Sequence, residues 1–439
     1  MNDRAAGAMI LSENKVVRLF SFFLLYVGQG LPLGVSTVAF PAWLVANGAS
    51  AADVGAIIAT AFLPWSFKFI PAAFMDRYAY LPMGRRRAWL ILAQFLMVAG
   101  FAIAAFAAPG PEDLQLILYV VFLIGAGSAI QDVAVDGLAV DILPEPDQGV
   151  ASSFMFGGQV VGRALAATAA GIGLQYYGSQ ATFLFFLPII LLITLYVVFL
   201  RERPGERRLP WSAGEAHPIN LNRHVRAWWP IFVTTMKSLV KINSLKLLVA
   251  AGFSRCAGGM FDTMWPIIGG VAFVGFSAAG YSGMVSTVDL VMAFVSIALG
   301  SAMTVWLGPR RASVIAWLGF AALALFIAFG QSIWMATLPF IAMTCAYSLL
   351  TTLTSICTNP LRMQLSEPEV AATQFTIYNS LSNLPVSLGA TLFAIIGGTD
   401  EMVRVLLIMA GLCTTGALIY ATMTIGNRPV AAEPVPEVN

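Results

Sequence analysis

The residues of this chain with the clearest chemical potential are charged side chains that lie inside long apolar runs. Lys68, Asp132, Asp136 and Arg163 occupy such positions in the first half of the sequence. An ionised group in hydrocarbon costs at least about 2.5–3.5 kcal/mol on insertion scales, so each needs a partner, water or a shifted pKa. Carboxylates held in this way can gain and lose protons. These four residues are therefore candidates for coupling proton movement to another process.

The depth of each charge along its predicted helix indicates how the four residues pair. At about 1.5 Å per residue, Lys68 and Asp136 lie about 10 Å from one end of their helices, and Asp132 and Arg163 lie about 16 and 20 Å from that end. Asp132 and Asp136 are four residues apart and share one helix face. We expect Lys68 to pair with Asp136 and Arg163 with Asp132, with Asp132 exchanging a proton. The alternative is that these are fixed ion pairs that only hold helices together.

The second half carries charges of the same kind. Arg255 lies about 16 Å from the corresponding end, while Asp262 and Asp289 lie about 25 Å from it. The two carboxylates have no obvious single partner, so substrate contacts and a structural cluster are both open. Uncharged polar residues in the spans predict a polar cavity as a set, although interhelical hydrogen bonds would explain any one of them. These residues are Gln29, Gln131, Gln159, Gln374, Tyr378, Asn379 and Asn383.

The composition places all these residues in a membrane. Apolar residues make up 59% of the 439-residue chain and charged residues 10%, against about 45–50% and about 25% in soluble domains. A spanning helix needs about 20 mostly apolar residues, and twelve such runs are present. They lie near 17–40, 52–75, 87–108, 113–143, 149–175, 180–200, 244–272, 278–306, 312–330, 332–358, 369–397 and 402–425.

A long polar interruption divides the twelve predicted spans into six and six. The expected organisation is a six-helix bundle at 1–200, a cytoplasmic linker at 201–243, a second six-helix bundle at 244–425, and a disordered cytoplasmic tail at 426–439. Within the linker, the apolar stretch 225–240 is expected to lie on the membrane surface.

The loop charges and an internal repeat predict topology and architecture. Nearly all of the 24 Lys and Arg residues fall in the N-terminal segment, the even-to-odd loops and the tail, and Arg404 is the only one assigned to the opposite side. This bias places both termini in the cytoplasm of a multi-pass inner-membrane protein. The segment Gly84 to Trp89 is echoed after span 8 by Gly308 to Ala312. Two similar six-helix halves with a site between them at mid-membrane are typical of secondary transporters.

Several short motifs in the first half are more specific. They are Gly28 to Leu33, Trp65 to Phe69, Asp76 to Tyr78, Gly84 to Trp89, and Gln131 to Asp136. Over about 28–163 this series resembles the AmpG muropeptide permeases and their acetyl-CoA-transporter relatives, a branch of the major facilitator superfamily. The resemblance implies an all-α membrane protein with twelve transmembrane helices in a 6+6 fold. It also implies proton-driven import of GlcNAc linked to anhydro-MurNAc with a peptide stem.

The resemblance further implies a cytoplasmic gate at the loop between helices 2 and 3. In the superfamily this loop latches the gate, and its acidic residue, here Asp76, would face the N-terminus of helix 11, whose dipole favours an anion. The gate residues carried over to this sequence are Asp76, Arg77, Gly84, Arg85, Arg86 and Arg87.

Other functional classes receive less support. The chain has no GxxxxGK[ST] loop, which argues against an ATP-driven pump, and no His in any span, which argues against a metalloenzyme. We expect no enzyme activity, cofactor, metal or nucleic-acid partner, and a monomer whose partners are a small-molecule substrate, protons and the lipid bilayer. A siderophore importer, a nucleotide or acyl-CoA carrier, a drug exporter and a transporter-fold receptor stay open. An anion carrier would leave Arg163 or Arg255 unpaired and facing the cavity.

Overall fold

Long apolar runs dictate the architecture, because a backbone in lipid must satisfy its own hydrogen bonds and a helix does so within one segment. The computed structural model describes residues 9–222, 233, 236–366 and 371–424. Within these residues the regular elements are helices, apart from an isolated bridge between Ile10 and Arg201. The predicted tail at 426–439 and most of the predicted surface helix at 225–240 lie outside the described residues.

The first half contains six spans. A π-helical turn, η1, carries α2 directly into α3, and α4 is followed after a short break by α5, so each of these groups forms one span. The bounds are α2 (Lys15–Gly34), η1 (Val35–Ala39), α3 (Phe40–Ala46), α4 (Ala51–Ser66), α5 (Phe69–Arg77), α6 (Arg87–Ala107), α7 (Leu114–Ile142), α8 (Glu145–Tyr176) and α9 (Gly178–Phe199). The short helices η2 (Leu81–Met83) and α10 (Pro218–Asn222) lie in loops.

The second half repeats this arrangement with six more spans. They are α12 (Ile242–Gly269), α13 (Ala278–Leu307), α14 (Pro309–Phe329), α16 (Thr337–Leu365), α17 (Ala371–Ile395) and α18 (Met402–Ala421), with the short α15 (Gln331–Trp334) before α16. Each of the twelve predicted spans corresponds to observed helix, which confirms the predicted all-α 6+6 fold.

The bounds of one span differ in a way that matters for function. The prediction for the tenth span was 332–358, whereas α16 runs from Thr337 to Leu365 with Pro360 inside it. Proline is tolerated inside membrane helices, where neighbouring groups satisfy the freed carbonyl. The additional seven residues, about two helical turns, bring Arg362 into the span.

The long helices differ in polarity. By length and composition, nine spans among the described residues are apolar enough to cross a membrane. The other three long helices, α8, α12 and α17, carry more polar residues, and all three pack across the boundary between the halves. Polar groups in a membrane protein face the interior or a water-filled cavity. The less apolar helices therefore mark the interior of this molecule.

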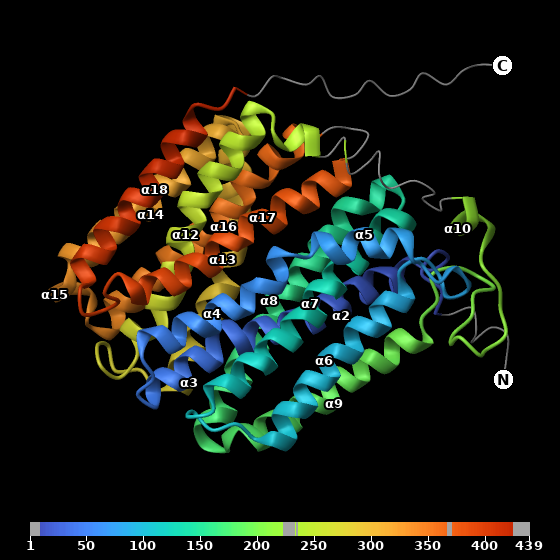
Figure 1. The fold of residues 1–439 in the computed structure, drawn as a ribbon, viewed down its shortest axis with the longest axis horizontal. Coiled ribbons are helices and arrows are strands. Elements are labelled where there is room, and N and C mark those ends of the chain that lie inside the picture. The colour runs from blue at the N-terminus through green and yellow to red at the C-terminus, as the bar shows by residue number, and fades with distance from the viewer. Residues whose placement is uncertain (1–8, 223–232, 234–235, 367–370, 425–439) are drawn as a thin grey trace.

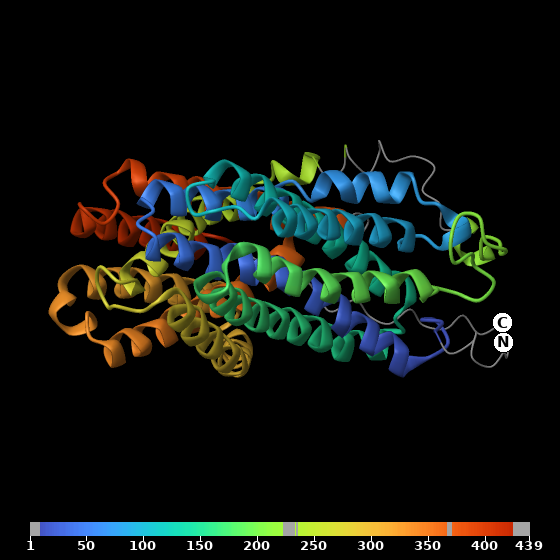
Figure 2. The ribbon, with the colours of Figure 1, turned by 90° about the horizontal axis from the view of Figure 1, so that it is seen from below.

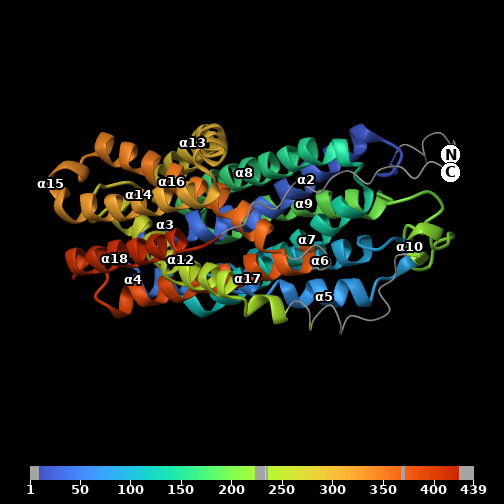
Figure 3. The same cartoon turned by 90° about the horizontal axis from the view of Figure 1, so that it is seen from above.

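The two halves lie side by side along the long axis of the molecule (Figures 1, 2 and 3). In Figure 1 the helices run diagonally, with α3 and α15 toward the lower left and α5 and α10 toward the upper right. We call the end that holds α5, α10 and the segment between the halves the linker end, and the other the α3 end. The loops rich in Lys and Arg lie at the linker end.

Glycines let α2 and α8 approach each other closely in the first half. A Cβ atom on Gly30 would lie 2.5 Å from the carbonyl oxygen of Gln159, and one on Gly162 would lie 2.2 Å from that of Val27. At such distances only the hydrogen side chain of glycine fits. This close approach fixes α8 beside α2, with the backbone of Arg163 at the contact.

The halves meet at the α3 end through small residues. A Cβ on Gly55 of α4 would lie 2.4 Å from the carbonyl oxygen of Ala390 on α17, and one on Gly171 of α8 would lie 2.5 Å from the side chain of Ser282 on α13. The backbone N–H of Ala279 also donates to Gln175 across the same boundary, at 2.8 Å. We call this region the α3-end seam. It closes the space between the bundles at that end.

Candidate functional site

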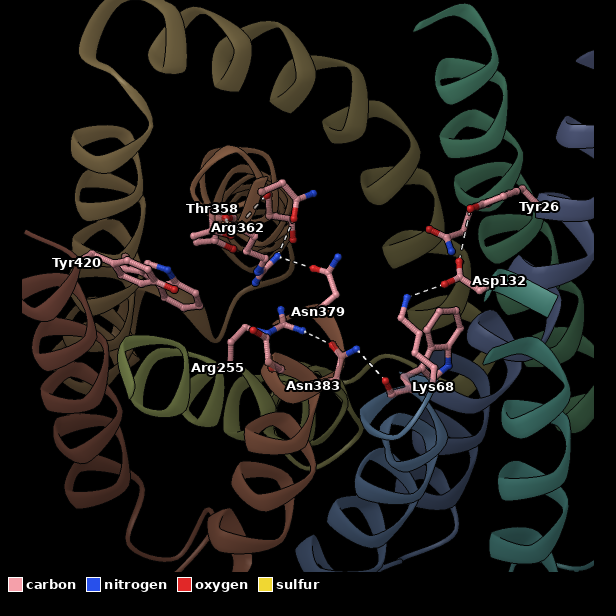
Figure 4. Close-up of a pocket in the computed structure, with 16 residues that line it drawn as sticks. Tyr26, Lys68, Asp132, Arg255, Thr358, Arg362, Asn379, Asn383 and Tyr420 are labelled. Carbon is pink, nitrogen blue, oxygen red and sulfur yellow. Dashed lines mark hydrogen bonds and ion pairs between the residues drawn. The ribbon is translucent and has the colours of Figure 1, made fainter. Parts of the chain in front are cut away.

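A cavity of about 310 Å³ lies between the two bundles. From the first half it is lined by residues of α2, α4, α7 and α8 and of the break between α4 and α5. From the second half it is lined by residues of α12, α14, α16, α17 and α18. Figure 4 shows these side chains pointing toward one another from opposite sides. We call the two sides the first-half face and the second-half face.

An ion pair dominates the first-half face. Lys68 lies in the break between α4 and α5, four residues after Pro64, where the helix loses a backbone donor. Its ammonium lies 2.6 Å from Asp132 Oδ2, and both side chains are about nine-tenths buried. The side-chain amide of Gln29 donates to the other carboxylate oxygen of Asp132 at 2.7 Å. Asp132 is thus neutralised and hydrogen-bonded within its own half.

The predicted pairing of Lys68 with Asp136 is wrong. Asp136 instead accepts a 2.6 Å hydrogen bond from the hydroxyl of Tyr26. Asp132 and Asp136 lie one helical turn apart on the same face of α7, so a flexible lysine at the α4–α5 break can reach either. In the structure Lys68 reaches Asp132, the deeper of the two carboxylates.

The predicted pairing of Arg163 with Asp132 is also wrong. Arg163 lies 3.0 Å from Asp289 of α13, so this ion pair crosses from one half to the other. The close packing of α2 on α8 explains the difference, because it places the backbone of Arg163 against Gly30 and leaves the side chain to face the other half. Ser348 of α16 also donates to Asp289, at 2.6 Å.

Asp262 lies near this crossing but has a different partner. Its carboxylate accepts a short hydrogen bond from the hydroxyl of Tyr347, whose ring stacks on Trp265 with centroids 4.2 Å apart. Asp262 and Asp289 do not line the 310 Å³ cavity. Of the two roles left open for these carboxylates, the contacts favour a polar cluster beside the α3-end seam.

Two arginines dominate the second-half face. Arg255 of α12 donates to Asn383 Oδ1 at 3.1 Å and to the carbonyl of Ser382 at 3.3 Å. Arg362 of α16 donates to the amide oxygens of Asn359 at 2.6 Å and Asn379 at 2.9 Å. Neither arginine forms an ion pair with a carboxylate in the part of the chain that the structure describes.

The uncharged polar candidates separate into two groups. Gln159, Asn379 and Asn383 line the cavity. Gln131 and Tyr378 are buried elsewhere, where Gln131 donates to the carbonyl of Leu25 at 2.6 Å and Tyr378 exchanges a 2.6 Å hydrogen bond with Ser244. The second group connects helices within one half.

Sequence reasoning missed several residues of the cavity. Arg362 was assigned to a loop, because the tenth span was ended at 358. Tyr26, Trp317, Thr358 and Tyr420 also line the cavity, but aromatic and hydroxyl residues are too common in spans to stand out. A helix allowed to pass through Pro360 would have revealed Arg362.

The predicted gate loop contacts the linker. The backbone N–H groups of Arg85, Arg86 and Arg87 donate to the carboxylate of Glu202 at 2.8, 2.7 and 2.6 Å. Gly84 has φ +100°, and a Cβ there would lie 2.3 Å from the Glu202 carboxyl carbon. Glu202 thereby satisfies free donors at the N-terminus of α6.

Further contacts keep this loop in the first half. The side chains of Arg85 and Arg86 contact Asp141 at the end of α7, and Arg87 donates to the carbonyl of Val198 at 3.0 Å. Arg77 is exposed at the end of α5, and the side chain of Asp76 lies outside the described part of the structure. The gating role of the loop stays a prediction.

The linker itself contains a titratable pair. The carboxylate of Glu206 accepts from the backbone N–H groups of Glu202 and Arg203, at 3.1 and 2.9 Å, and from Asn220 at 2.8 Å. Burial, together with the neighbouring Glu202, raises the pKa of Glu206 to about 8. Burial also raises the pKa of Glu202, against the opposing effect of its three backbone donors.

The fold and the site together define a class of protein: a membrane transporter in which two six-helix bundles enclose a polar cavity. A family model described as Major Facilitator Superfamily matches residues 19–390, which is most of the chain. The protein belongs to the major facilitator superfamily and is a transporter rather than an enzyme.

Relatives and solved structures support this assignment at different levels. The chain is 30% identical to the anhydromuropeptide permease of Escherichia coli K12 over 149 residues, which are 32% of this chain and 30% of the permease. It is 28% identical to a Rickettsia felis protein designated AmpG 4 over 196 residues, 43% of this chain and 46% of that protein. These matches therefore span less than half of either relative.

The likeness to solved structures covers nearly the whole chain and shows the fold alone. A peptide transporter, POT, in complex with alafosfalin has a TM-score of 0.69 and 13% identity, covering 96% of this chain and 97% of that one. The nucleoside transporter NupG has a TM-score of 0.68 and 12% identity, covering 92% of this chain and 98% of that one.

Proposed function

We propose that this protein is a proton-coupled secondary transporter of the inner membrane. It imports a polar, sugar-containing solute, such as an anhydromuropeptide, by alternating access. The observation that carries the proposal is the cavity between the halves, in which a buried Lys68–Asp132 pair faces two arginines held by amides.

The first-half face supports proton coupling. A carboxylate that is buried beside a lysine keeps its charge only while that pair is intact. Movement of the halves changes the surroundings of Asp132, and a proton can then replace Lys68 as its partner. Asp136 lies one turn away beneath Tyr26 and is exposed, so it can pass a proton between Asp132 and solvent.

The orientation follows from the charges and the seam. Lys and Arg are concentrated in the loops at the linker end, which supports a cytoplasmic location for that end and, with it, for both termini. The α3-end seam then closes the periplasmic side. Exposure of Asp136 and Ser355 on the linker side of the cavity supports access from the cytoplasm. The structure corresponds in this interpretation to the state that releases an imported solute.

The substrate class follows from the lining. The cavity contains amides, hydroxyls and charged groups together with the rings of Trp65 and Trp317. Polar groups with aromatic faces suit sugar rings and peptide bonds better than an apolar drug. The similarity to the anhydromuropeptide permease, over a third of the chain, supports the same choice.

The test is uptake into inverted or reconstituted vesicles of known orientation, with a proton gradient imposed. Labelled GlcNAc–anhydro-MurNAc tripeptide is expected to accumulate in the presence of the gradient and to stop accumulating when a protonophore is added. Vesicles that contain the Asp132→Asn variant are the matched control. Gradient-independent equilibration of the tripeptide would refute proton coupling, and no uptake at all would refute the substrate.

A second candidate is a carrier of other organic anions, such as nucleotides or acyl-CoA. It is favoured by one observation, the absence of a carboxylate partner for Arg255 and Arg362 among the described residues. A panel of nucleotides, acyl-CoA and a ferric siderophore in the same vesicles separates these carriers from the muropeptide importer.

A further inference from the structure

The second-half face of the cavity carries positive charge that its own residues do not balance. Arg362 is only 8% exposed. Its partners, like the side-chain partner of Arg255, are neutral amides within the described chain. Taking a charge out of water is costly unless an opposite charge replaces the lost solvation. In the first-half face Asp132 supplies that opposite charge to Lys68.

Unused hydrogen-bond donors also gather around this cavity. Three buried N–H groups of cavity-lining residues have no acceptor among the described groups: Nε of Arg362 and Nε1 of Trp65 and of Trp317. Buried donors in proteins are nearly always satisfied by protein, water or ligand. All three groups are donors, and two of them belong to the second-half face, so they favour a ligand rich in acceptor atoms over one rich in donors.

The unbalanced positive charge and the unpartnered donors therefore both favour an anionic ligand with acceptor oxygens. A guanidinium presents a planar fork of donors that matches the two oxygens of a carboxylate or phosphate. Figure 4 shows Arg255 and Arg362 on the same side of the cavity, opposite Lys68 and Asp132. Asn383 and Asn379 hold the two arginines in place without neutralising them.

We propose that Arg255 and Arg362 form an anion subsite that binds a carboxylate or phosphate group of the transported solute. The subsite deepens the proposed function, because it states which part of a sugar-peptide the second half recognises. It predicts that neutral forms of the solute are poor ligands.

The test compares ligands that differ only in this group. Binding to the purified full-length protein in nanodiscs is measured by calorimetry with N-acetylmuramic acid, its methyl ester and N-acetylglucosamine 6-phosphate. The acid is expected to bind at least about tenfold more tightly than the ester, which is about 1.4 kcal/mol. Equal binding of acid and ester, together with no binding of the phosphate at millimolar concentration, would overturn the proposal.

Substitutions assign the effect to the two arginines. Arg255→Gln and Arg362→Gln are each expected to remove the preference for the acid, while binding of the ester changes little. Arg362→Lys keeps the charge but loses the fork and is expected to keep part of the preference. Arg404→Gln, at an exposed position of α18, is the matched control and is expected to behave like wild type. A preference for the acid that survives in both Gln variants would refute the assignment.

The outcomes also separate this inference from the proposed function. If vesicles with the wild-type protein take up no muropeptide, but acid selectivity still depends on the arginines, then muropeptide import is refuted and the anion subsite is kept. Tighter binding of the phosphate than of the acid also supports the subsite and identifies its group as a phosphate. Muropeptide uptake that is unchanged by both Gln variants keeps the proposed function and refutes the subsite.

Discussion

The two faces of the central cavity handle buried charge in opposite ways. In the first-half face, Lys68 and Asp132 neutralise each other at 2.6 Å, and Gln29 completes the hydrogen bonding of the carboxylate. In the second-half face, Arg255 and Arg362 contact amide and carbonyl oxygens only, within the described residues. The charges of the first-half face balance each other, whereas the two arginines of the second-half face have no balancing carboxylate among the described residues.

The difference indicates a division of labour between the halves. Water can solvate the arginines while the cavity is open, but closing the halves around an empty cavity would strip that water away and leave unbalanced charge. An anionic ligand removes this penalty. The first-half face carries no such penalty while its Lys68–Asp132 pair is intact. Ligand would therefore govern closure through the second half, and protons would act through the first.

The largest expected effect comes from breaking the neutral face. Removing one partner of a buried ion pair costs about 3–5 kcal/mol, so Lys68→Gln and Asp132→Asn are each expected to lower the thermal stability of the purified protein markedly. The double variant is expected to recover most of that stability and to show only background uptake. Fluorescence-detected thermal unfolding and vesicle uptake measure the two properties. Wild-type uptake by the double variant would reduce the pair to a structural role.

A smaller effect is expected from making the second face resemble the first. Asn383→Asp places a carboxylate at the position of an amide oxygen that lies 3.1 Å from Arg255. The new pair is expected to raise thermal stability and to weaken binding of acidic ligands by about tenfold, which is about 1.4 kcal/mol. Calorimetry with N-acetylmuramic acid measures the loss. Thr391→Ala, at an exposed position of the same helix outside the cavity lining, where the hydroxyl donates to the carbonyl of Ser387 in α17 itself, serves as the control. Tighter acid binding by Asn383→Asp would contradict the comparison.

A few-fold effect is expected from removing the ion pair that joins the two halves. The ion pair of Arg163 with Asp289 bridges the halves but is partly exposed, at 38% and 21% of the two side chains, so its contribution is about 1 kcal/mol or less. Asp289→Asn is expected to increase, a few-fold, the population that is open at the α3 end. Labelling of a cysteine placed at Ser282 in the seam, on a background without the four native cysteines, reports that population. An unchanged labelling rate would exclude a latching role for the pair.

The smallest effect concerns the linker, which is docked on the first half. Because the folded pKa of Glu206 is raised to about 8, docking is fully favoured below the ordinary carboxyl pKa of about 4.3 and weakens as pH rises through about 8. Hydrogen exchange of residues 200–222 is therefore expected to quicken between pH 6 and pH 9, after correction for intrinsic rates. Glu206→Gln is expected to remove this pH dependence. Slower corrected exchange at high pH would contradict the assignment.

The fold could be predicted from the sequence because lipid leaves few options. Apolar runs of sufficient length must be helices, and the polar segment after Phe199 separates six of them from the next six. The exception was α16, which continues through Pro360 to Leu365, beyond the predicted end at 358. Tolerance of proline depends on neighbouring helices, and these are not visible in a linear sequence.

The sequence identified several residues of the candidate site, but it did not show which of them form ion pairs with one another. Lys68, Asp132 and Arg255 stood out because charge is rare in apolar runs, and all three line the cavity. Depth along a helix is a one-dimensional measure, however. It could not reveal the break that carries Lys68 to Asp132, or the packing against α2 that aims Arg163 at the other half.

The α3-end seam has a mechanical consequence. Where Gly55 and Gly171 press against a backbone carbonyl and a serine, the halves approach each other at points that carry no side chain. These points can separate without a rotamer change. The barrier to opening on that side would then come mainly from the few polar bonds that span it, so that single hydrogen bonds, rather than wholesale repacking, set how fast the transporter turns over.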